Sequence, residues 1–310
     1  MTIESKLISF THKFKEEDIQ LNIATETIYG TVTLPEIHGE VPVVLMIAGS
    51  GPTDRNGNNN YGLLTDCSKM IAYELAQKGI ASVRYDKRGI GESSKAMKSE
   101  EELVFDDYVN DTVNWVQMLY KDKRFSKVAI LGHSEGSLIG MIAAEKTRVD
   151  AFISVAGMGH SFYDTLKRQL ISQPKEVYNE CVHIMDELKK GNKIADMSKE
   201  YYSLFRPSVQ PYLTSLFKYE PTVEIKKLNI PVLIIQGTTD LQVTEEDAKM
   251  LKSSKPDALL MIIDGMNHIL KDAPVDQEKN SETYGNPKLP LSAEFKESLI
   301  SFINLHLRDK

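Results

Sequence analysis

Residues 128–140 read V-A-I-L-G-H-S-E-G-S-L-I-G, and the predicted fold is built outward from them. Their first four residues form a short apolar run typical of a buried strand, and the small and apolar residues after Gly136 predict a helix. A strand, then G-x-S-x-G, then a helix is the context of the nucleophile-elbow motif. Ser134 would lie at the tip of a sharp turn, where a side chain at either flanking glycine would clash. The alternative is a glycine-rich turn with a capping serine.

This turn would raise the Ser134 hydroxyl above the sheet edge and leave the next backbone N–H, that of Glu135, facing a substrate oxyanion. A serine hydroxyl needs a base to take its proton, and an imidazole oriented by a carboxylate suits that role near neutral pH. The chain offers Ser134, Asp240 and His268 in the order expected of this motif. Asp240 and His268 each follow a predicted strand, so the three residues could meet at one carboxyl edge of the sheet.

Other residues compete for these roles. His160 opens the segment after the strand at 150–156 and is the alternative base, whereas the side chain of His133 is expected to point away from Ser134. Asp264 is the alternative acid; like Asp272 it is close to His268 in sequence, but neither follows a separate strand.

Two glycine-rich loops accompany the elbow. Residues 41–48 predict a buried strand that runs into G-S-G-P-T-D-R-N-G-N-N-N at 49–60, and a loop in this place can supply a second oxyanion donor from the N–H of Ser50. A surface turn is the alternative. Residues 86–93, D-K-R-G-I-G-E-S, lack the spacing of a phosphate loop. We interpret them as a structural loop beside the elbow, with Asp86 and Arg88 paired.

The rest of the chain predicts an α/β fold with antiparallel strands at its N-terminal edge. Regular alternation stops between residues 157 and 220, so we predict a core at 1–156 and 222–310 with a helical lid inserted at 157–221. The lid has helical stretches at 161–173 and 175–190, and its aromatic residues could line an acyl pocket or form its own core and its contact with the main domain. The predicted edge strands are 3–14, 19–23 and 27–34; further strands are 80–85, 150–156, 230–235 and 258–263; helices are 66–78, 101–120, 245–253 and 292–307; a polar loop is 271–290; the lid aromatics are Tyr201, Tyr202, Phe205, Tyr212, Phe217 and Tyr219.

Composition narrows the possible partners. The 310 residues carry a net charge of -7, with 41% hydrophobic and 26% charged residues, which argues against nucleic acid as a partner. Cys67 and Cys181 have no metal or redox spacing, and neither H-E-x-x-H nor a nucleotide fingerprint occurs, so we expect no cofactor and no metal. No signal peptide or membrane-spanning run is seen, which predicts a cytoplasmic protein without a membrane partner, a monomer or a homodimer.

Taken together, the motifs resemble the α/β-hydrolase superfamily over nearly the whole chain, and more narrowly the bacterial acyl-esterase group related to serine aminopeptidase-like hydrolases. The resemblance implies a mostly parallel sheet flanked by helices, with a helical cap between the sixth and seventh strands. It implies Ser134 as nucleophile, His268 as base and Asp240 as acid, with oxyanion N–H groups from Glu135 and from Ser50 or Gly51, since Ala48-Gly49 replaces the usual His-Gly. The motifs are G-S-G-P-T-D-R-N-G at 49–57, D-K-R-G-I-G-E-S at 86–93, G-H-S-E-G at 132–136, G-T-T-D-L-Q-V at 237–243, G-M-N-H at 265–268 and N-P-K-L-P-L at 286–291.

Three functions follow as hypotheses. The first is a carboxylic-ester hydrolase that works through an acyl-enzyme, with a preference for short-to-medium acyl chains that comes from the resemblance. The second is an aminopeptidase or amidase with the same triad, which would need lid carboxylates to hold a substrate ammonium. The third is a non-catalytic protein that binds a small ligand, against which the intact triad argues. The lid carboxylates, which could equally be a solvated helix face, are Glu176, Glu180, Asp186 and Glu187.

Overall fold

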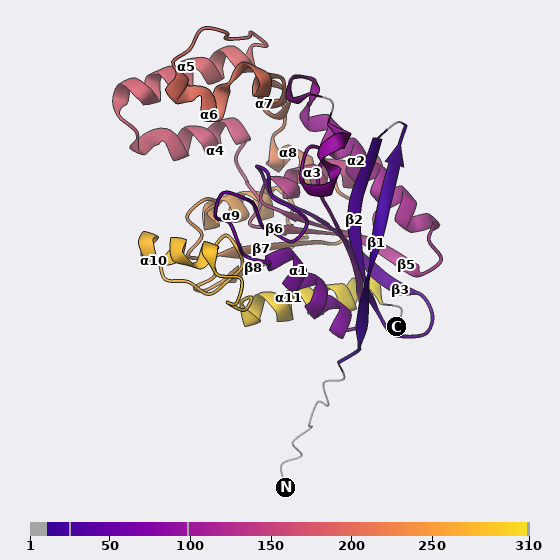
Figure 1. Ribbon diagram of the computed structural model, residues 1–310. Helices are drawn as coiled ribbons and strands as arrows, with labels where there is room; N and C mark the ends of the chain where they lie inside the picture. Colours follow the sequence, from indigo (N-terminus) through magenta and orange to yellow (C-terminus); the bar gives the residue numbers. More distant parts are fainter. Residues whose placement is uncertain (1–10, 25, 98, 309–310) are drawn as a thin grey trace.

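The computed structural model describes residues 11–24, 26–97 and 99–308 and contains one eight-stranded sheet in the order β1-β2-β4-β3-β5-β6-β7-β8 (Figure 1). Of the described strands, β2 alone runs opposite to the rest, because it pairs antiparallel with both β1 and β4 while all other pairs are parallel. The strands are β1 (Phe14–Ile23), β2 (Glu26–Pro35), β3 (Val41–Ile47), β4 (Ala81–Tyr85), β5 (Phe125–His133), β6 (Ala151–Val155), β7 (Val232–Gly237) and β8 (Leu259–Ile263).

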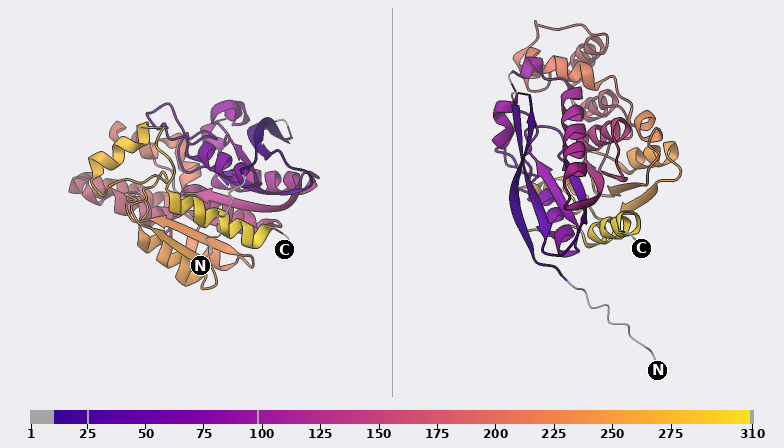
Figure 2. Two further views of the ribbon diagram at one scale, coloured as in Figure 1. Left: turned by 90° about the horizontal axis from the view of Figure 1, so that it is seen from below. Right: turned by 90° about the vertical axis from the view of Figure 1, so that its right-hand side faces the viewer.

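The central strands are buried on both faces because helices cover the sheet from both sides (Figures 1 and 2). Helices α1 and α11 pack on one face, around a cluster that includes Leu75 and Phe295. Helices α2, α3, α8 and α9 pack on the other face, around a cluster that includes Trp115 and Phe152. These helices are α1 (Cys67–Gln77), α2 (Phe105–Lys121), α3 (Glu135–Lys146), α8 (Pro221–Lys226), α9 (Glu245–Ser254) and α11 (Ala293–Leu307).

Most of the strand predicted at 3–14 lies outside the described residues. The structure departs from the predictions made for residues 101–120 and 271–290. The predicted helix at 101–120 begins later, at Phe105, because Asp107 accepts a hydrogen bond from the N–H of Val104 and so caps the helix there. The predicted polar loop at 271–290 contains helix α10 (Gln277–Glu282), which Asp276 caps by accepting from the N–H of Lys279.

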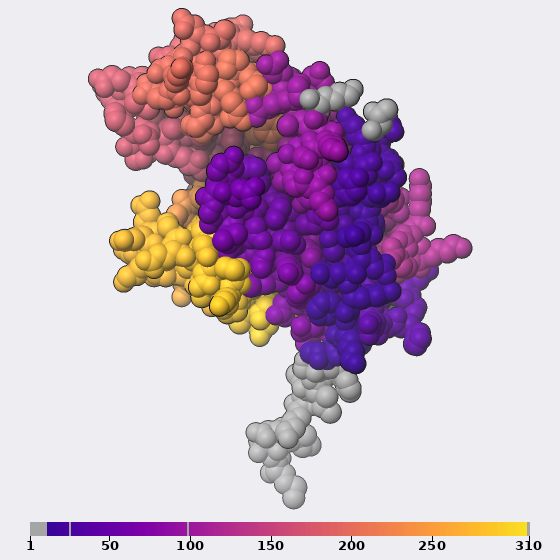
Figure 3. Space-filling view, viewed as in Figure 1, coloured from indigo at the N-terminus to yellow at the C-terminus, as the bar shows by residue number. Residues whose placement is uncertain are grey.

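Between β6 and β7 the chain forms a helical insertion that stands above the sheet in Figure 1. Its helices share their own apolar cluster, which contains Cys181, Met185 and Phe205, so this part buries a core separate from the two around the sheet. A hollow separates the insertion from the C-terminal segment on one face of the molecule (Figure 3). The helices are α4 (Phe162–Gln169), α5 (Lys175–Lys189), α6 (Tyr202–Phe205) and α7 (Gln210–Leu216).

The ends of β7 and β8 approach each other closely, and this brings the loops after them together. The N–H of Thr239 donates to the carbonyl of Met266, 3.1 Å away, which ties the loop carrying Asp240 to the loop carrying His268. A Cβ atom at Gly237 would lie 1.9 Å from the Met266 carbonyl oxygen, a distance that no side chain tolerates. Glycine at position 237 is therefore a condition for the two loops to meet.

We predict that Gly237→Ala lowers the free energy of unfolding by about 1–3 kcal/mol, the usual range for forced overpacking. The matched control is Gly285→Ala, since a Cβ atom at Gly285 would have no neighbour nearer than 4.0 Å. Urea unfolding followed by circular dichroism measures both. Equal stabilities for Gly237→Ala and the parent protein would show that the loops can separate without cost.

Candidate active site

The predicted elbow is present as a strained turn between β5 and α3. Ser134 has φ 55° and ψ −122°, a conformation that costs a non-glycine residue about 1–3 kcal/mol. A Cβ atom at Gly132 would lie 2.2 Å from the carbonyl oxygen of Gly136, and one at Gly136 would lie 2.4 Å from the carbonyl oxygen of Ile47. Both glycines of G-x-S-x-G are therefore required by backbone contacts.

Asp240 and His268 form a buried pair beside this turn. The Nδ1 atom of His268 lies 2.8 Å from an oxygen of Asp240, whose two oxygens also accept the backbone N–H groups of Gln242 and Val243 and the amide of Gln236. Burial opposes the charge on Asp240, but the His268 charge and these hydrogen bonds outweigh it and lower the pKa of the carboxyl. The carboxylate is thus ionised and held in one orientation against the imidazole.

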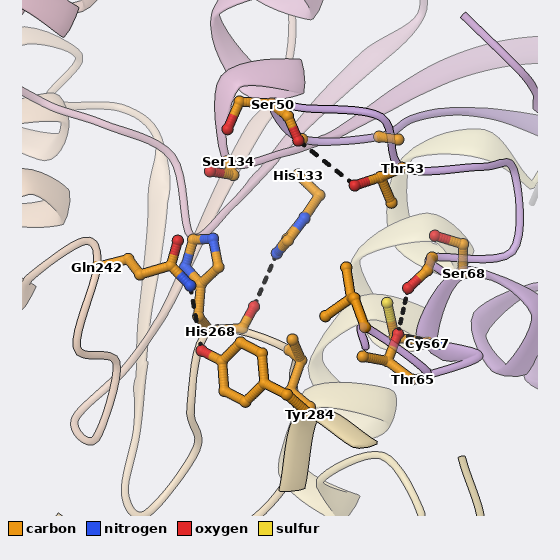
Figure 4. Close-up of a pocket in the computed structure, with 15 residues that line it drawn as sticks. Ser50, Thr53, Thr65, Cys67, Ser68, His133, Ser134, Gln242, His268 and Tyr284 are labelled. Atoms are coloured by element: carbon orange, nitrogen blue, oxygen red, sulfur yellow. Dashed lines mark hydrogen bonds between the residues drawn. The ribbon is translucent and has the colours of Figure 1, made fainter. Parts of the chain in front are cut away.

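His133 contributes to the site in a way that the sequence analysis did not foresee. Its side chain extends from the elbow toward His268, and its Nε2 atom lies 2.7 Å from the His268 carbonyl oxygen (Figure 4). Because a carbonyl can only accept, Nε2 carries the proton. Desolvation, together with repulsion from His268, lowers the pKa of His133 to about 4, so the ring is neutral near pH 7. It holds the backbone of His268.

The loop after β3 lies directly against the elbow. A Cβ atom at Gly49 would be 3.1 Å from the Cβ of Ser134, so the chain passes the serine at its closest possible distance. Within the described part of the chain, the backbone N–H groups of Ser50, Gly51 and Glu135 have no recorded acceptor. Ser50 lines the same pocket as Ser134, and both Ser50 and Gly51 stay available as the second donor.

The predicted pairing of Asp86 with Arg88 is wrong. Asp86 instead accepts from both the backbone and the guanidinium of Arg55, at 2.8 and 2.7 Å. Arg88 forms its ion pairs with Asp111 and Glu26. Asp86 and Arg55 belong to the two glycine-rich loops, so a buried ion pair joins those loops beside the elbow. The prediction was wrong because it paired Asp86 with a residue close to it in sequence, whereas the actual partner lies in a distant segment.

Ser134 and His268 line one small pocket of about 100 Å³ (Figure 4). No hydrogen bond joins their side chains within the described residues, and such contacts often tighten only when substrate is bound. The rest of the lining comes from His133 of the elbow, the loop after β3, the start of α1, the loop after β7 and the C-terminal segment, and none of it from residues 157–221. The other lining residues are Ala48, Gly49, Ser50, Thr53, Gly57, Leu63, Thr65, Cys67, Ser68, His133, Gln242, Ile269 and Tyr284.

The lid aromatics do not line this pocket: five of the six belong to the core of the lid or to its contact with the main domain, and Tyr202 is exposed. Phe205 and Phe217 are buried in the cluster of the insertion. The hydroxyls of Tyr212 and Tyr219 reach back to the main domain, where they donate to Glu135 and Asp106.

The segment containing α10 supports the site from outside. The amide of Asn280 donates to the carbonyl of Thr239, and the amide of Asn267 donates to the side chains of Asn280 and Thr283. Tyr284 reaches the pocket and accepts a hydrogen bond from Gln242, 3.2 Å away. Gln242 belongs to the G-T-T-D-L-Q-V motif, but nothing in the polar composition of residues 271–290 indicated these contacts.

The alternative residues lie elsewhere. Asp264 accepts from the hydroxyl of Thr238, and Asp272 is exposed. His160 has its Nδ1 atom 3.0 Å from Asp247, a buried carboxylate that also pairs with Arg168 of α4. These contacts anchor the start of the insertion to α9.

Across residues 11–24, 26–97 and 99–308, no cluster of three or more His, Cys, Asp or Glu side chains is arranged to hold a metal ion. In the same ranges, no helix is both long enough and apolar enough to cross a membrane.

Residues 42–272 match the family model for the alpha/beta hydrolase fold, and the chain belongs to this family. Esterase EstD of Thermotoga maritima is 29% identical to it over 281 residues. That alignment covers 86% of this chain and 64% of EstD, so the chain spans less than two thirds of that relative's length.

Solved structures share the fold at low sequence identity. Est1E from Butyrivibrio proteoclasticus, with ferulic acid bound, superposes with a TM-score of 0.61 at 16% identity, over 93% of this chain and 99% of that one. The esterase Pf2001 of Pyrococcus furiosus gives a TM-score of 0.58 at 13% identity, over 95% and 94% of the two chains. These similarities, together with the family match, confirm the predicted fold class.

We predict a pH-dependent contribution of Asp247 to stability. Burial opposes its ionisation, but hydrogen bonds from Thr244 and His160 outweigh burial and lower its pKa to about 2. An unfolded aspartate titrates near 3.9, so ionised Asp247 stabilises the fold by about 2 kcal/mol above that pH, and the contribution disappears as the pH falls toward 2. Asp247→Asn should therefore be less stable at pH 7, with a difference from the parent that shrinks below pH 4.

Urea unfolding at several pH values measures this difference. Asp272→Asn, at an exposed aspartate, is the matched control and should follow the parent at every pH. A difference between Asp247→Asn and the parent that stays constant from pH 7 to pH 3 would contradict the prediction.

Proposed function

We propose that this chain is a serine carboxylesterase that works through an acyl-enzyme. The observation that supports it is the shared pocket: the strained Ser134 of an elbow opens into the same small cavity as an imidazole already paired with a buried carboxylate. Two similar proteins add support, because EstD and Pf2001 are both named as esterases. The roles of Ser134, His268 and Asp240 as nucleophile, base and acid are part of the proposal.

In the proposed mechanism, the Ser134 hydroxyl oxygen attacks the ester carbonyl carbon while Nε2 of His268 takes its proton. The carbonyl oxygen becomes an oxyanion that accepts from the N–H groups of Glu135 and of Ser50 or Gly51. When the intermediate collapses, the C–O bond to the alcohol breaks and His268 returns the proton to the leaving oxygen. Water then attacks the acyl-enzyme with His268 again as base, which releases the carboxylic acid and restores Ser134.

The proposed role of Asp240 is electrostatic. Its ionised carboxylate accepts the Nδ1–H of His268, which leaves Nε2 free to face Ser134. The same negative charge stabilises the imidazolium that forms at each proton transfer. The three further donors to Asp240 keep it in place without neutralising it.

The pocket supports a short acyl chain. Its volume of about 100 Å³ is small beside the roughly 300–1,000 Å³ of pockets that enclose drug-sized ligands, so a short acyl group fits it better than a long chain. Leu63 and Ile269 provide apolar contacts, and Thr65 and Cys67 lie beside them in the lining. We therefore narrow the expected preference to the short end of the predicted range.

The aminopeptidase alternative has less support. An aminopeptidase must pair the substrate ammonium with a carboxylate, yet the described pocket lining contains no Asp or Glu. The lid carboxylates have other places: Asp186 accepts from Tyr163, Glu187 pairs with Lys190, and Glu176 and Glu180 are exposed.

The non-catalytic alternative has less support as well. A protein that only binds a ligand would gain nothing from the strained backbone of Ser134 or from the buried pair of His268 and Asp240, although both cost free energy. A cytoplasmic location and a monomeric or homodimeric state stay predictions.

We predict that the protein hydrolyses p-nitrophenyl acetate and butyrate with higher kcat/KM than the octanoate, and leaves aminoacyl-anilides intact. Ser134→Ala should lower ester turnover by roughly 10⁶-fold, to background, because it removes the attacking oxygen. Ser253→Ala, at an exposed serine of α9, is the matched control and should keep the parent rate. Ester turnover by Ser134→Ala at the parent rate would exclude the proposed nucleophile, and anilide turnover would favour the aminopeptidase.

We predict that Asp240→Asn keeps the fold but lowers kcat by roughly 10⁴-fold, because an amide in place of the carboxylate favours the wrong imidazole tautomer. Stopped-flow measurement of p-nitrophenol release gives the rate, and the melting temperature controls for folding. A loss smaller than tenfold would mean that Asp240 only supports the loop.

A further inference from the structure

Lys87 is a buried lysine that the proposed mechanism does not use. Its side chain is 2% exposed, and its ammonium donates to the carbonyl oxygen of Gly49 at 2.6 Å. The ammonium also lies over the ring of Tyr108, 5.0 Å from its centroid. Burial lowers the pKa of Lys87, while the charge of Glu135 opposes that shift. Burial of a lysine ammonium is unfavourable unless its contacts compensate for the lost hydration.

The carbonyl that Lys87 contacts belongs to the peptide that joins Gly49 to Ser50. In a trans peptide, the C=O of one residue and the N–H of the next point in opposite directions within one plane. An ammonium fixed on the Gly49 carbonyl therefore directs the Ser50 N–H away from Lys87. Ser50 lines the pocket with Ser134, and its N–H has no recorded acceptor among the described residues.

Contact with the elbow restricts this peptide from the other side. Gly49 passes Ser134 so closely that even a Cβ atom would lie 3.1 Å from that of the serine. Lys87 and the elbow thus hold the peptide between them. The positive charge on the carbonyl oxygen also polarises the peptide, which makes the Ser50 N–H a stronger donor.

The second expected donor belongs to the same group of contacts. Glu135 supplies the other N–H, and its buried carboxylate accepts from the hydroxyl of Tyr212 in α7. The rings of Tyr108 and Tyr212 pack edge to face, 5.7 Å apart. Lys87 therefore contacts the peptide of one expected donor directly, and Tyr108 connects it to Tyr212 of the insertion, which contacts the side chain of the other donor residue.

We infer that Lys87 is a positioning residue of the oxyanion hole: its ammonium holds and polarises the Gly49–Ser50 peptide so that the Ser50 N–H faces the developing oxyanion. This rests on the proposed esterase function and deepens it, because it selects Ser50 over Gly51 as the second donor. Lys87 touches neither substrate nor the reacting atoms.

The test is Lys87→Met, which matches the apolar part of the lysine side chain but removes the ammonium. We expect kcat for p-nitrophenyl butyrate to fall by about 10- to 100-fold with KM changed less than threefold, since a misdirected donor weakens binding of the transition state more than of the substrate. Affinity for a trifluoromethyl ketone, which forms a tetrahedral adduct on serine, should fall by the same factor as kcat. The amplitude of the p-nitrophenol burst counts active sites.

Lys255→Met is the matched control, since Lys255 is also buried but pairs with Asp257 at a distance from the pocket; its kcat and inhibitor affinity should equal those of the parent. Lys87→Gln, which retains an uncharged donor, is the second variant if Lys87→Met does not fold, and it should lose less activity. A parent-like kcat in either Lys87 variant, or a loss that matches only the fraction of active sites, would overturn the inference. An inactive parent protein would overturn the proposed function and this inference with it.

Discussion

Backbone close approach at the carboxyl edge of the sheet is the constraint on which this structure depends. At Gly132, Gly136 and Gly237 a single added Cβ atom would lie within 2.4 Å of a carbonyl oxygen from another segment. These contacts force Ser134 into its strained turn and bring the loops after β7 and β8 together. Protein interiors are too dense to absorb such an overlap, so the candidate site exists only because these positions carry no side chain.

Three buried carboxylates around this edge each have a partner, and each pair joins segments that are distant in sequence. Asp240 meets His268, Asp86 meets Arg55, and Asp247 meets Arg168. A buried charge without a partner is far more costly than an exposed one, so these pairs specify which loops lie side by side. The same logic applies to Lys87, whose ammonium is directed at one backbone carbonyl.

The helical insertion is tied to the core but does not form the pocket in the described structure. It has its own apolar cluster, and it contacts the elbow through the hydroxyl of Tyr212 and α9 through His160 and Arg168, which both contact Asp247. The pocket instead lies toward the start of α1 and the segment that contains α10. A small pocket on that side supports a short acyl group.

What the sequence determined by itself was local: the strand, turn and helix around Ser134, the order of the three candidate catalytic residues, and the alternation that predicts an α/β sheet. Those features depend on the periodicity of hydrophobic residues and on glycine at a sharp turn, and both can be read from residues that are neighbours in the sequence. Only the tertiary structure decided that Asp86 pairs with Arg55 rather than Arg88, that His133 holds the backbone of His268, and that Lys87 contacts Gly49. Each of these contacts joins residues that are brought together only when the chain packs. A buried polar group needs a partner, but the spacing of residues along the chain does not show which partner it will meet.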